Sequence, residues 1–252
     1  MNKQSFKLYF ASDLHLGAPD AVQSRIREQR FVRWLDSIKH QASALYLVGD
    51  VFDYWYEYQM VVPKGYTRLL GKLAELVDLG IEVHLFTGNH DLWMFGYFEE
   101  EIGLRVHHKP LLFTHNDKTF LVGHGDGLGP GDKGYKWLKK YLFTNRFCQF
   151  LLSVLHPNLT LKILRYFSKT SRQFGHQNKE KKVVIDRLLV YAQKKSLQTD
   201  SINYFVFGHQ HCPKNITINP NSQYFNLGDW INYHTYAVFD GENMCLQTFD
   251  EA

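Results

Sequence analysis

The chain has 252 residues, of which 44% are hydrophobic and 21% are charged, and its formal net charge is +4. This length suits one large domain or one domain with an insertion, and the composition excludes a disordered or fibrous protein. No apolar run approaches the roughly 18 residues of a membrane-spanning helix. Three cysteines, an odd number without metal-type spacing, predict reduced thiols in a cytoplasmic compartment. The first residues enter a strand-like pattern almost at once, which predicts that no signal peptide is present.

The first half of the chain alternates between predicted strands and predicted helices. Residues 22–40 and 67–79 carry apolar side chains close to helical spacing, and Gly80 follows the second segment where a helix C-cap glycine belongs. Short β-branched or aromatic runs separate these segments, as expected for strands of a βαβ arrangement.

After residue 110 the pattern becomes richer in strands. Residues 111–114 and 119–122 predict a hairpin around Asn116-Asp117, and residues 216–249 predict an antiparallel meander. A βαβ half followed by a β-rich half predicts an α/β fold in which two sheets pack face to face with helices outside.

Between these halves lies a basic and apolar stretch. Residues 133–179 contain ten Lys or Arg and no Asp or Glu, so the remainder of the chain carries about −6 (4 − 10). The triplet His156-Pro157-Asn158 divides the stretch into two predicted helices. We interpret residues 132–180 as an inserted helical cap, with residues 1–131 and 181–252 forming the core.

Four interpretations of this insert remain open from its composition. It is a solvated helical face, a nucleic-acid site, a contact for a protein partner, or a surface that sits on anionic lipid. Nucleic acid is the less favoured binding partner, because residues 151–155 (Leu-Leu-Ser-Val-Leu) offer nothing for base stacking and much for acyl chains.

Five short polar signatures each follow an apolar, strand-like run. They are Asp13-Leu14-His15, Gly49-Asp50-Val51-Phe52-Asp53, Gly88-Asn89-His90-Asp91, Gly123-His124-Gly125-Asp126 and Gly208-His209-Gln210-His211. Loops at the carboxyl ends of strands gather at one edge of an open α/β sheet. The signatures therefore predict one site in which Asp, Asn and His surround two divalent cations.

The mixed oxygen and nitrogen donors suit Mn²⁺, Fe or Zn²⁺ better than Ca²⁺. Two neighbouring cations need a shared carboxylate, and Asp50 is the natural candidate. Such a site acidifies bound water and clamps the attacking and leaving oxygens of a displacement at phosphorus. Taken singly, Asp13, Asp50 and Asp53 could each instead cap a helix or a turn.

In order and spacing, the motifs DxH, GDxxD, GNHD, GHGD and GHxH resemble the calcineurin-like metallophosphoesterase superfamily. The resemblance implies a four-layer α-β-β-α sandwich of two mixed sheets. It implies that one metal is held by Asp13, His15, Asp50 and His211, and the other by Asp50, Asn89, His124 and His209. It also implies that His90 donates a proton to the leaving group or stabilises the phosphorane charge, and that Asp53 orients His90.

Within the superfamily, residues 13–17, 47–55, 124–128 and 226–230, together with the helical insert, resemble UDP-2,3-diacylglucosamine pyrophosphatases of the Bacteroidetes type. This resemblance implies Mn²⁺-dependent cleavage of UDP-2,3-diacylglucosamine to 2,3-diacylglucosamine 1-phosphate and UMP in lipid A biosynthesis. It implies a peripheral location on the cytoplasmic face of the inner membrane, with the cap taking the acyl chains. The proteobacterial enzymes carry Arg where this chain has His90.

Substrate contacts are expected at Asp126, Lys169 and Arg172, and no nucleic-acid partner is expected. The aromatic residues Trp55, Tyr56 and Tyr58 either line the substrate cleft or pack beneath the insert. Two alternative functions are a soluble phosphodiesterase or nucleotide pyrophosphatase of the same superfamily, and a non-catalytic scaffold with the same fold. The scaffold is disfavoured because the chain keeps His90 and the complete ligand set.

Overall fold

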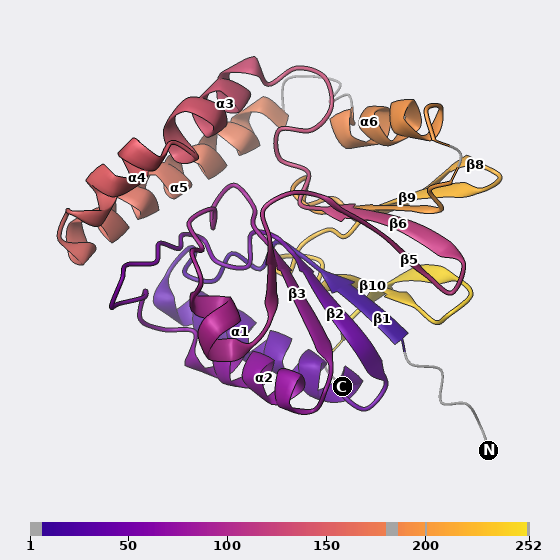
Figure 1. Cartoon of the computed structure of the whole chain (residues 1–252), viewed down its shortest axis with the longest axis horizontal. Helices are drawn as coiled ribbons and strands as arrows, with labels where there is room; N and C mark the ends of the chain where they lie inside the picture. The colour runs from indigo at the N-terminus through magenta and orange to yellow at the C-terminus, as the bar shows by residue number, and fades with distance from the viewer. Residues whose placement is uncertain (1–6, 180–185, 200, 251–252) are drawn as a thin grey trace.

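Two β-sheets packed face to face organise the chain, as the computed structural model shows for residues 7–179, 186–199 and 201–250, the side chains of residues 171–179 excepted (Figure 1). The first sheet has the order β11-β10-β1-β2-β3-β4 and the second the order β5-β6-β7-β9-β8. Strands of the first sheet are β1 (Lys7–Ala11), β2 (Ala42–Val48), β3 (Glu82–Phe86), β4 (Arg105–His107), β10 (Thr235–Phe239) and β11 (Met244–Thr248). Those of the second are β5 (Leu111–His115), β6 (Lys118–Gly123), β7 (Tyr204–Phe207), β8 (Lys214–Asn219) and β9 (Ser222–Asn226).

Aromatic side chains fill the space between the two sheets. Phe10 of β1 stacks on Phe120 of β6 with ring centroids 6.0 Å apart, and Phe239 meets Phe120 edge-on at 5.1 Å. These side chains belong to strands buried on both faces, which explains why the runs that end in the polar signatures are almost continuously apolar.

Helices cover the outer face of each sheet. α1 (Ala21–Ile38) and α2 (Thr67–Asp78) pack their apolar faces on the first sheet, and α6 (Arg187–Ser196) packs on the second. Asp20 caps α1 by accepting from the N–H groups of Val22 and Gln23, and Gly80 follows α2 with a φ of 82°. The predicted four-layer α-β-β-α sandwich of two mixed sheets is confirmed.

The predicted hairpin is confirmed, but the predicted meander is wrong. Asn116 and Asp117 both adopt left-handed backbone between β5 and β6, as a two-residue hairpin loop requires. The last four strands form two separate hairpins, because β9 pairs with β7 in the second sheet whereas β10 pairs with β1 in the first. Alternating apolar residues indicate strands but do not reveal which sheet each strand joins.

The basic stretch forms a group of helices that lies at one side of the sandwich (Figure 1). It contains α3 (Lys133–Leu138), the π-helical η2 (Lys139–Phe143), α4 (Arg146–Ser153) and α5 (Pro157–Lys179); a second π-helical turn, η1 (Phe98–Ile102), belongs to the core. The break before Pro157 is confirmed, and a further break occurs at Asn145, whose side chain caps α4. Within the described part of the chain, none of the helices is both long and apolar enough to cross a bilayer.

Aromatic residues join these helices to the core. Tyr56 donates its hydroxyl hydrogen to the Gln149 carbonyl at 2.7 Å, and the Trp93 indole donates to the Phe143 carbonyl at 3.0 Å. Tyr56 and Trp55 are 1% and 0% exposed. Tyr56 therefore packs beneath the insert, in a cluster with Leu164, whereas Trp55 packs within the core against Phe52 and Phe98.

Candidate metal centre

The loops that carry the five signatures meet at the carboxyl-terminal ends of the strands. Loops after β1, β2 and β3 supply the signatures of the first sheet, and loops after β6 and β7 supply those of the second. Parallel pairing of β1, β2 and β3, and of β6 with β7, places all five loops on the same side of the sandwich.

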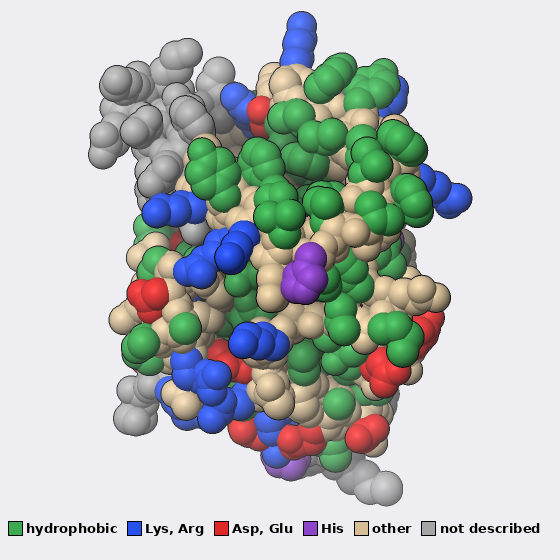
Figure 2. Space-filling view, turned by 90° about the vertical axis from the view of Figure 1, so that its left-hand side faces the viewer, with side chains coloured by type: hydrophobic (Ala, Val, Ile, Leu, Met, Phe, Trp, Pro, Cys, Tyr) green, Lys and Arg blue, Asp and Glu red, His purple; other side chains and the backbone are tan. Residues whose placement is uncertain are grey.

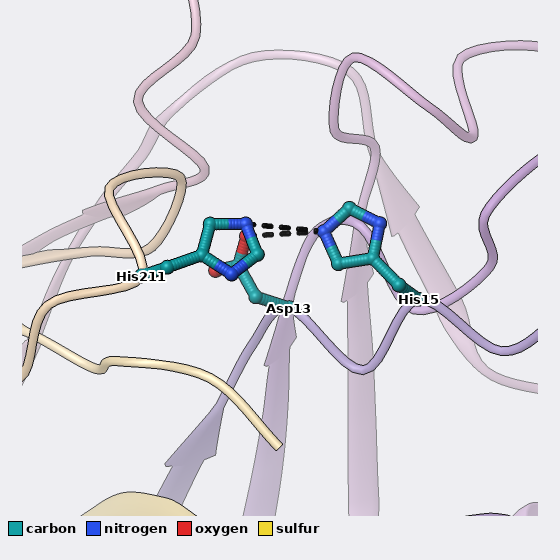
Figure 3. A group of neighbouring side chains, drawn as sticks. All are labelled: Asp13, His15 and His211. Carbon is teal, nitrogen blue, oxygen red and sulfur yellow. Dashed lines mark hydrogen bonds and ion pairs between the residues drawn. The ribbon is translucent and has the colours of Figure 1, made fainter. Parts of the chain in front are cut away.

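The first cluster consists of Asp13, His15 and His211 (Figure 3). His211 Nε2 lies 3.2 Å from Asp13 Oδ1 and 3.2 Å from His15 Nε2. One donor atom from each of the three residues lies within 4.8 Å of the other two. Asp13 Oδ1 is fully buried, and within the described part of the chain no group donates a hydrogen bond to it. A carboxylate oxygen in that situation suits a cation.

The second cluster consists of Asp50, His124 and His209, and the Asn89 side chain joins it. Asn89 Oδ1 lies 3.3 Å from His124 Nε2. Asp50 Oδ2 lies 3.3 Å from His124 Nε2 and 3.6 Å from His15 Nε2. The Asp50 carboxylate therefore stands between the two clusters, where a shared ligand is expected to stand.

Groups behind the histidines orient their rings. The Nδ1 atom of His124 lies 3.0 Å from the Val48 carbonyl, which can only accept, so Nδ1 carries the hydrogen. His211 Nδ1 lies 3.0 Å from Asp229 Oδ2 in the same way. Both rings consequently present Nε2 to the clusters, the arrangement that metal-ligating histidines generally adopt.

Five of the seven expected ligands adopt left-handed backbone, which is uncommon for residues other than glycine. Their φ angles are 57° at Asp13, 45° at His15, 50° at Asp50, 67° at His209 and 53° at His211. Each such residue costs about 1–3 kcal/mol and persists only where surrounding structure enforces it. Their concentration at one place is typical of a functional site.

Asp91 links two of the signature loops. Its buried carboxylate accepts hydrogen bonds from the N–H groups of Gly88 at 2.7 Å, Val51 at 2.9 Å, Phe52 at 3.2 Å and Asp50 at 3.3 Å. These bonds fix the loop that carries Asn89 against the loop that carries Asp50. Burial, and then the charge of Asp50, raise the pKa of Asp91 to about 7.

The electrostatics of the buried site favour positive charge. Burial lowers the pKa of an imidazole, but at His124 the carboxylates of Asp50, Asp13 and Asp126 together outweigh burial and raise the pKa to about 10. Burial would raise the pKa of Asp50, and His124 and His90 beside it hold that pKa well below its ordinary range. The pKa of buried Asp13 is likewise lowered, by His211 and His15. The ionised carboxylates of Asp13 and Asp50 therefore create a strongly negative potential inside the site, which attracts cations.

His90 lies beside the clusters and contacts two groups through Nδ1. This atom is 3.0 Å from Ser168 Oγ of α5 and 3.2 Å from the Asp53 carbonyl. The Asp53 carboxylate is 3.8 Å from His90 Nδ1 and closer, at 3.4 Å, to His15 Nδ1. Asp53 thus reaches His90 through its backbone, and its side chain stands behind His15.

The three expected substrate contacts differ in their surroundings. Asp126 accepts from the Tyr135 hydroxyl at 2.6 Å and pairs with Lys139 at 2.5 Å, so groups of α3 and η2 already engage its carboxylate. Lys169 is exposed on α5, and the side chain of Arg172 lies outside the described residues. A cavity of about 530 Å³ is lined by residues 57–62, 95–97, 100 and 101, none of which belongs to either cluster.

Asp91, Asp229 and Ser168 contribute to the site, and the motifs alone assigned no role to any of them. Asp91 closes the third signature and Asp229 lies in a resembling segment, so both were within reach of the sequence. Asp229 also accepts from the backbone N–H groups of Ile231 and Asn232, which holds its carboxylate behind His211. The contact of Ser168 with His90 could not be predicted from the sequence, because it depends on how α5 sits on the core.

A sandwich of two mixed sheets whose loops gather two clusters of Asp and His belongs to the class of metal-dependent phosphoesterases. A family model described as Calcineurin-like phosphoesterase matches residues 6–213. The chain belongs to the calcineurin-like phosphoesterase family. The buried carboxylates, the inward-facing imidazole nitrogens and the buried Asp13 oxygen fit the divalent metal ions on which this family depends.

The chain is similar to curated relatives over nearly its whole length. It is 34% identical to a UDP-2,3-diacylglucosamine hydrolase of Porphyromonas gingivalis, covering 97% of this chain and 98% of the relative. It is 27% identical to a UDP-2,3-diacylglucosamine hydrolase of Haemophilus influenzae, covering 92% and 94%. Among solved structures, Yfce, a phosphoesterase from E. coli, is 15% identical with a TM-score of 0.46 and covers 95% of this chain and 91% of that one.

Proposed function

We propose that the protein hydrolyses UDP-2,3-diacylglucosamine to 2,3-diacylglucosamine 1-phosphate and UMP, in lipid A biosynthesis, with two Mn²⁺ ions as cofactors. The observation that carries this proposal is the contact between the apolar helices and the metal centre. α5 reaches His90 through Ser168, and α3 and η2 reach Asp126 through Tyr135 and Lys139. A diphosphate at the clusters would therefore lie beside helices suited to acyl chains. The names of the two relatives support the same substrate.

The exposed face of these helices is unusually apolar. Figure 2 shows hydrophobic side chains gathered in its upper part with Lys and Arg around them. We call this set the apolar face; it consists of Trp137, Tyr141, Leu142, Phe147, Phe150, Leu151, Val154, Leu159, Tyr166 and Phe167, which are 45–68% exposed. Apolar surface of this kind on a soluble fold is typical of a lipid or partner contact.

In the proposed reaction one metal is held by Asp13, His15, Asp50 and His211, and the other by Asp50, Asn89, His124 and His209. When bound, the metals supply a nucleophile at neutral pH and stabilise charge on the phosphoryl oxygens. Water adds to the α-phosphorus, the bond to the bridging oxygen breaks, and the lipid phosphate leaves. His90 stands where it can donate a proton to the leaving oxygen or stabilise the charge on phosphorus, with its Nδ1 hydrogen held by the Asp53 carbonyl.

The proposal predicts Mn²⁺-dependent release of UMP from UDP-2,3-diacylglucosamine in detergent micelles, measured by chromatography. Phe150→Ser and Leu151→Ser should raise KM for this lipid about tenfold, which corresponds to about 1.4 kcal/mol of lost apolar contact. The same variants should hydrolyse bis(p-nitrophenyl) phosphate at the wild-type rate, because that small diester does not need the apolar face.

Leu112→Ser is the matched control, since Leu112 is 56% exposed on β5, outside the apolar face. It should leave both activities unchanged. Good turnover of soluble nucleotides with no UMP released from the lipid would instead assign the protein as a soluble phosphodiesterase. Absence of any hydrolysis with both metals bound would favour a scaffold.

We further propose that residues 132–180 form a cap that places the protein at the cytoplasmic surface of the inner membrane. Lys136 donates to the Gly129 carbonyl and Lys139 pairs with Asp126, so these two lysines face inward. Lys140, whose ammonium lies 5.1 Å from the centre of the Tyr141 ring, and Lys162 are exposed and would meet anionic headgroups.

The double variant Lys140→Gln/Lys162→Gln should therefore bind phosphatidylglycerol vesicles more weakly, by about 1 kcal/mol per removed charge. Sedimentation with vesicles measures this loss, and Lys118→Gln/Lys64→Gln, which removes two charges from the core, is the control. Hydrolysis of the small diester should not change. An equal loss of vesicle binding and diester hydrolysis would mean that the cap supports the core and not a membrane contact.

A further inference from the structure

One face of α5 is buried although its neighbouring side chains are exposed. Thr160, Leu164 and Ser168 are 0%, 7% and 6% exposed, whereas Tyr166 and Phe167 are 68% and 63% exposed. A spacing of four residues places the first three on the same face of the helix. Leu164 and Ser168 contact the core from this face, and Thr160 donates to the Leu152 carbonyl of α4 at 3.3 Å.

Apolar contacts determine where α5 sits. Leu164 packs in a cluster with Tyr56, Leu92 and Trp93 of the core, and Leu161 borders the same cluster. The Ser168 hydroxyl lies one turn further along and is not part of that cluster. Replacing Ser168 with alanine should therefore remove the hydroxyl without displacing the helix.

Among the side chains of the cap that the structure describes, Ser168 is the one that bonds to His90. Three groups surround His90 Nδ1: Ser168 Oγ at 3.0 Å, the Asp53 carbonyl at 3.2 Å and the Asp53 carboxylate at 3.8 Å. The last distance is too long for a hydrogen bond. Since the carbonyl only accepts, Nδ1 carries the hydrogen and Ser168 Oγ can share it as a second acceptor. Nε2 is then bare in the neutral ring, and it is the nitrogen that carries the second hydrogen in the protonated ring, the form that can donate to a leaving oxygen.

We propose that Ser168 is a positioning residue for His90: its hydroxyl fixes the orientation and tautomer of the ring, so that His90 is set for reaction only while α5 sits on the core. This inference rests on the proposed function, in which His90 acts on the phosphate. Seating of the cap is thereby coupled to the chemistry of the site through one side chain. A diphosphate meets an oriented His90 only when the helices that hold its acyl chains are in place.

The kinetic test is a double-mutant cycle on bis(p-nitrophenyl) phosphate, a substrate too small to need the apolar face. Ser168→Ala should lower kcat about tenfold with KM nearly unchanged, because a misplaced group loses catalysis and not ground-state binding. In the His90→Ala background Ser168→Ala should have no further effect. Losses that multiply in the double variant would overturn the proposal, since Ser168 would then act independently of His90.

The spectroscopic test does not depend on activity. In the metal-free protein, labelled with ¹⁵N at histidine, His90 should show a protonated Nδ1 and an unprotonated Nε2. Ser168→Ala should shift these signals toward a mixture of tautomers, and Ser168→Thr, which keeps the hydroxyl, should retain the wild-type pattern. Thr170→Ala is the matched control on the same helix, because the Thr170 hydroxyl donates to the Tyr166 carbonyl of α5 itself.

These readouts separate failure of the inference from failure of the proposed function. If the lipid is not a substrate, the ¹⁵N signals and the diester cycle still report on Ser168 and His90. His90 signals that are identical in wild type and Ser168→Ala would overturn the inference even if the lipid is hydrolysed. Equal melting temperatures of wild type, Ser168→Ala and Thr170→Ala would show that all three chains are folded.

Discussion

Asp50→Asn should remove nearly all metal-dependent stabilisation and strongly reduce hydrolysis while leaving the metal-free protein folded. Asp50 Oδ2 lies near His15 of the first cluster and His124 of the second. Its Oδ1 accepts from the backbone N–H of His90 at 2.9 Å, a bond that the asparagine oxygen can keep. Changing a group that merely supports a ligand costs about 10–100-fold in metal affinity. Because Asp50 serves both clusters, we expect kcat/KM for the small diester to fall on the order of 10³-fold.

The measurement is the melting temperature with and without Mn²⁺. At a metal concentration about 100-fold above Kd, wild type should gain about 2.7 kcal/mol, and Asp50→Asn should gain almost nothing. Without metal the variant should stay folded but be less stable than wild type, because the neutral amide no longer pairs with the protonated imidazole of buried His124. Asp117→Asn, in the exposed turn between β5 and β6, is the control and should behave as wild type. A full Mn²⁺-dependent rise in the variant would contradict the shared-ligand role.

Asp91→Ala should be the most destabilising single change near the site. It leaves the buried N–H groups of Gly88, Val51 and Phe52 without their acceptor. At about 1–2 kcal/mol for each of three donors, the free energy of unfolding should fall by about 3–6 kcal/mol. Urea denaturation in the presence of a chelator measures this loss apart from any effect on metal binding.

Asp240→Ala is the matched control for Asp91→Ala. Asp240 also accepts from backbone N–H groups, those of Glu242 at 2.9 Å and Asn243 at 2.8 Å, but in an exposed turn where water can replace it. We expect a cost of about 1 kcal/mol or less. Similar losses in the two variants would show that Asp91 contributes no more than an ordinary turn residue.

The sequence was sufficient to predict the layers of the fold and where the signatures lie. Apolar runs that end in Asp or His predict buried strands with polar loops, and this local pattern does not depend on the partner of each strand. The pairing of the last hairpins could not be predicted, because β9 and β10 have similar composition although they join different sheets. Strand partners are decided by the path of the chain between Asn226 and Thr235, which periodicity does not encode.

Side-chain roles that depend on tertiary contacts were also beyond the sequence. Asp126 was expected to contact substrate, and the structure adds that its carboxylate is bonded to Tyr135 and Lys139. Asp53 was expected to orient His90, and the structure adds that the contact is made by the Asp53 carbonyl while the carboxylate lies closer to His15. In each case the motif identified a residue at the site, and its neighbours depended on the packing of a distant segment.

The final hairpin makes the C-terminal segment indispensable to the first sheet. β10 covers the side of β1 that faces away from β2, and Asp229 lies on the connection that leads into it. A fragment ending at residue 213, where the family match stops, would expose the unpaired backbone of β1 to other chains and invite aggregation. The boundary of the shared motif region is therefore not the boundary of a unit that can be expressed by itself.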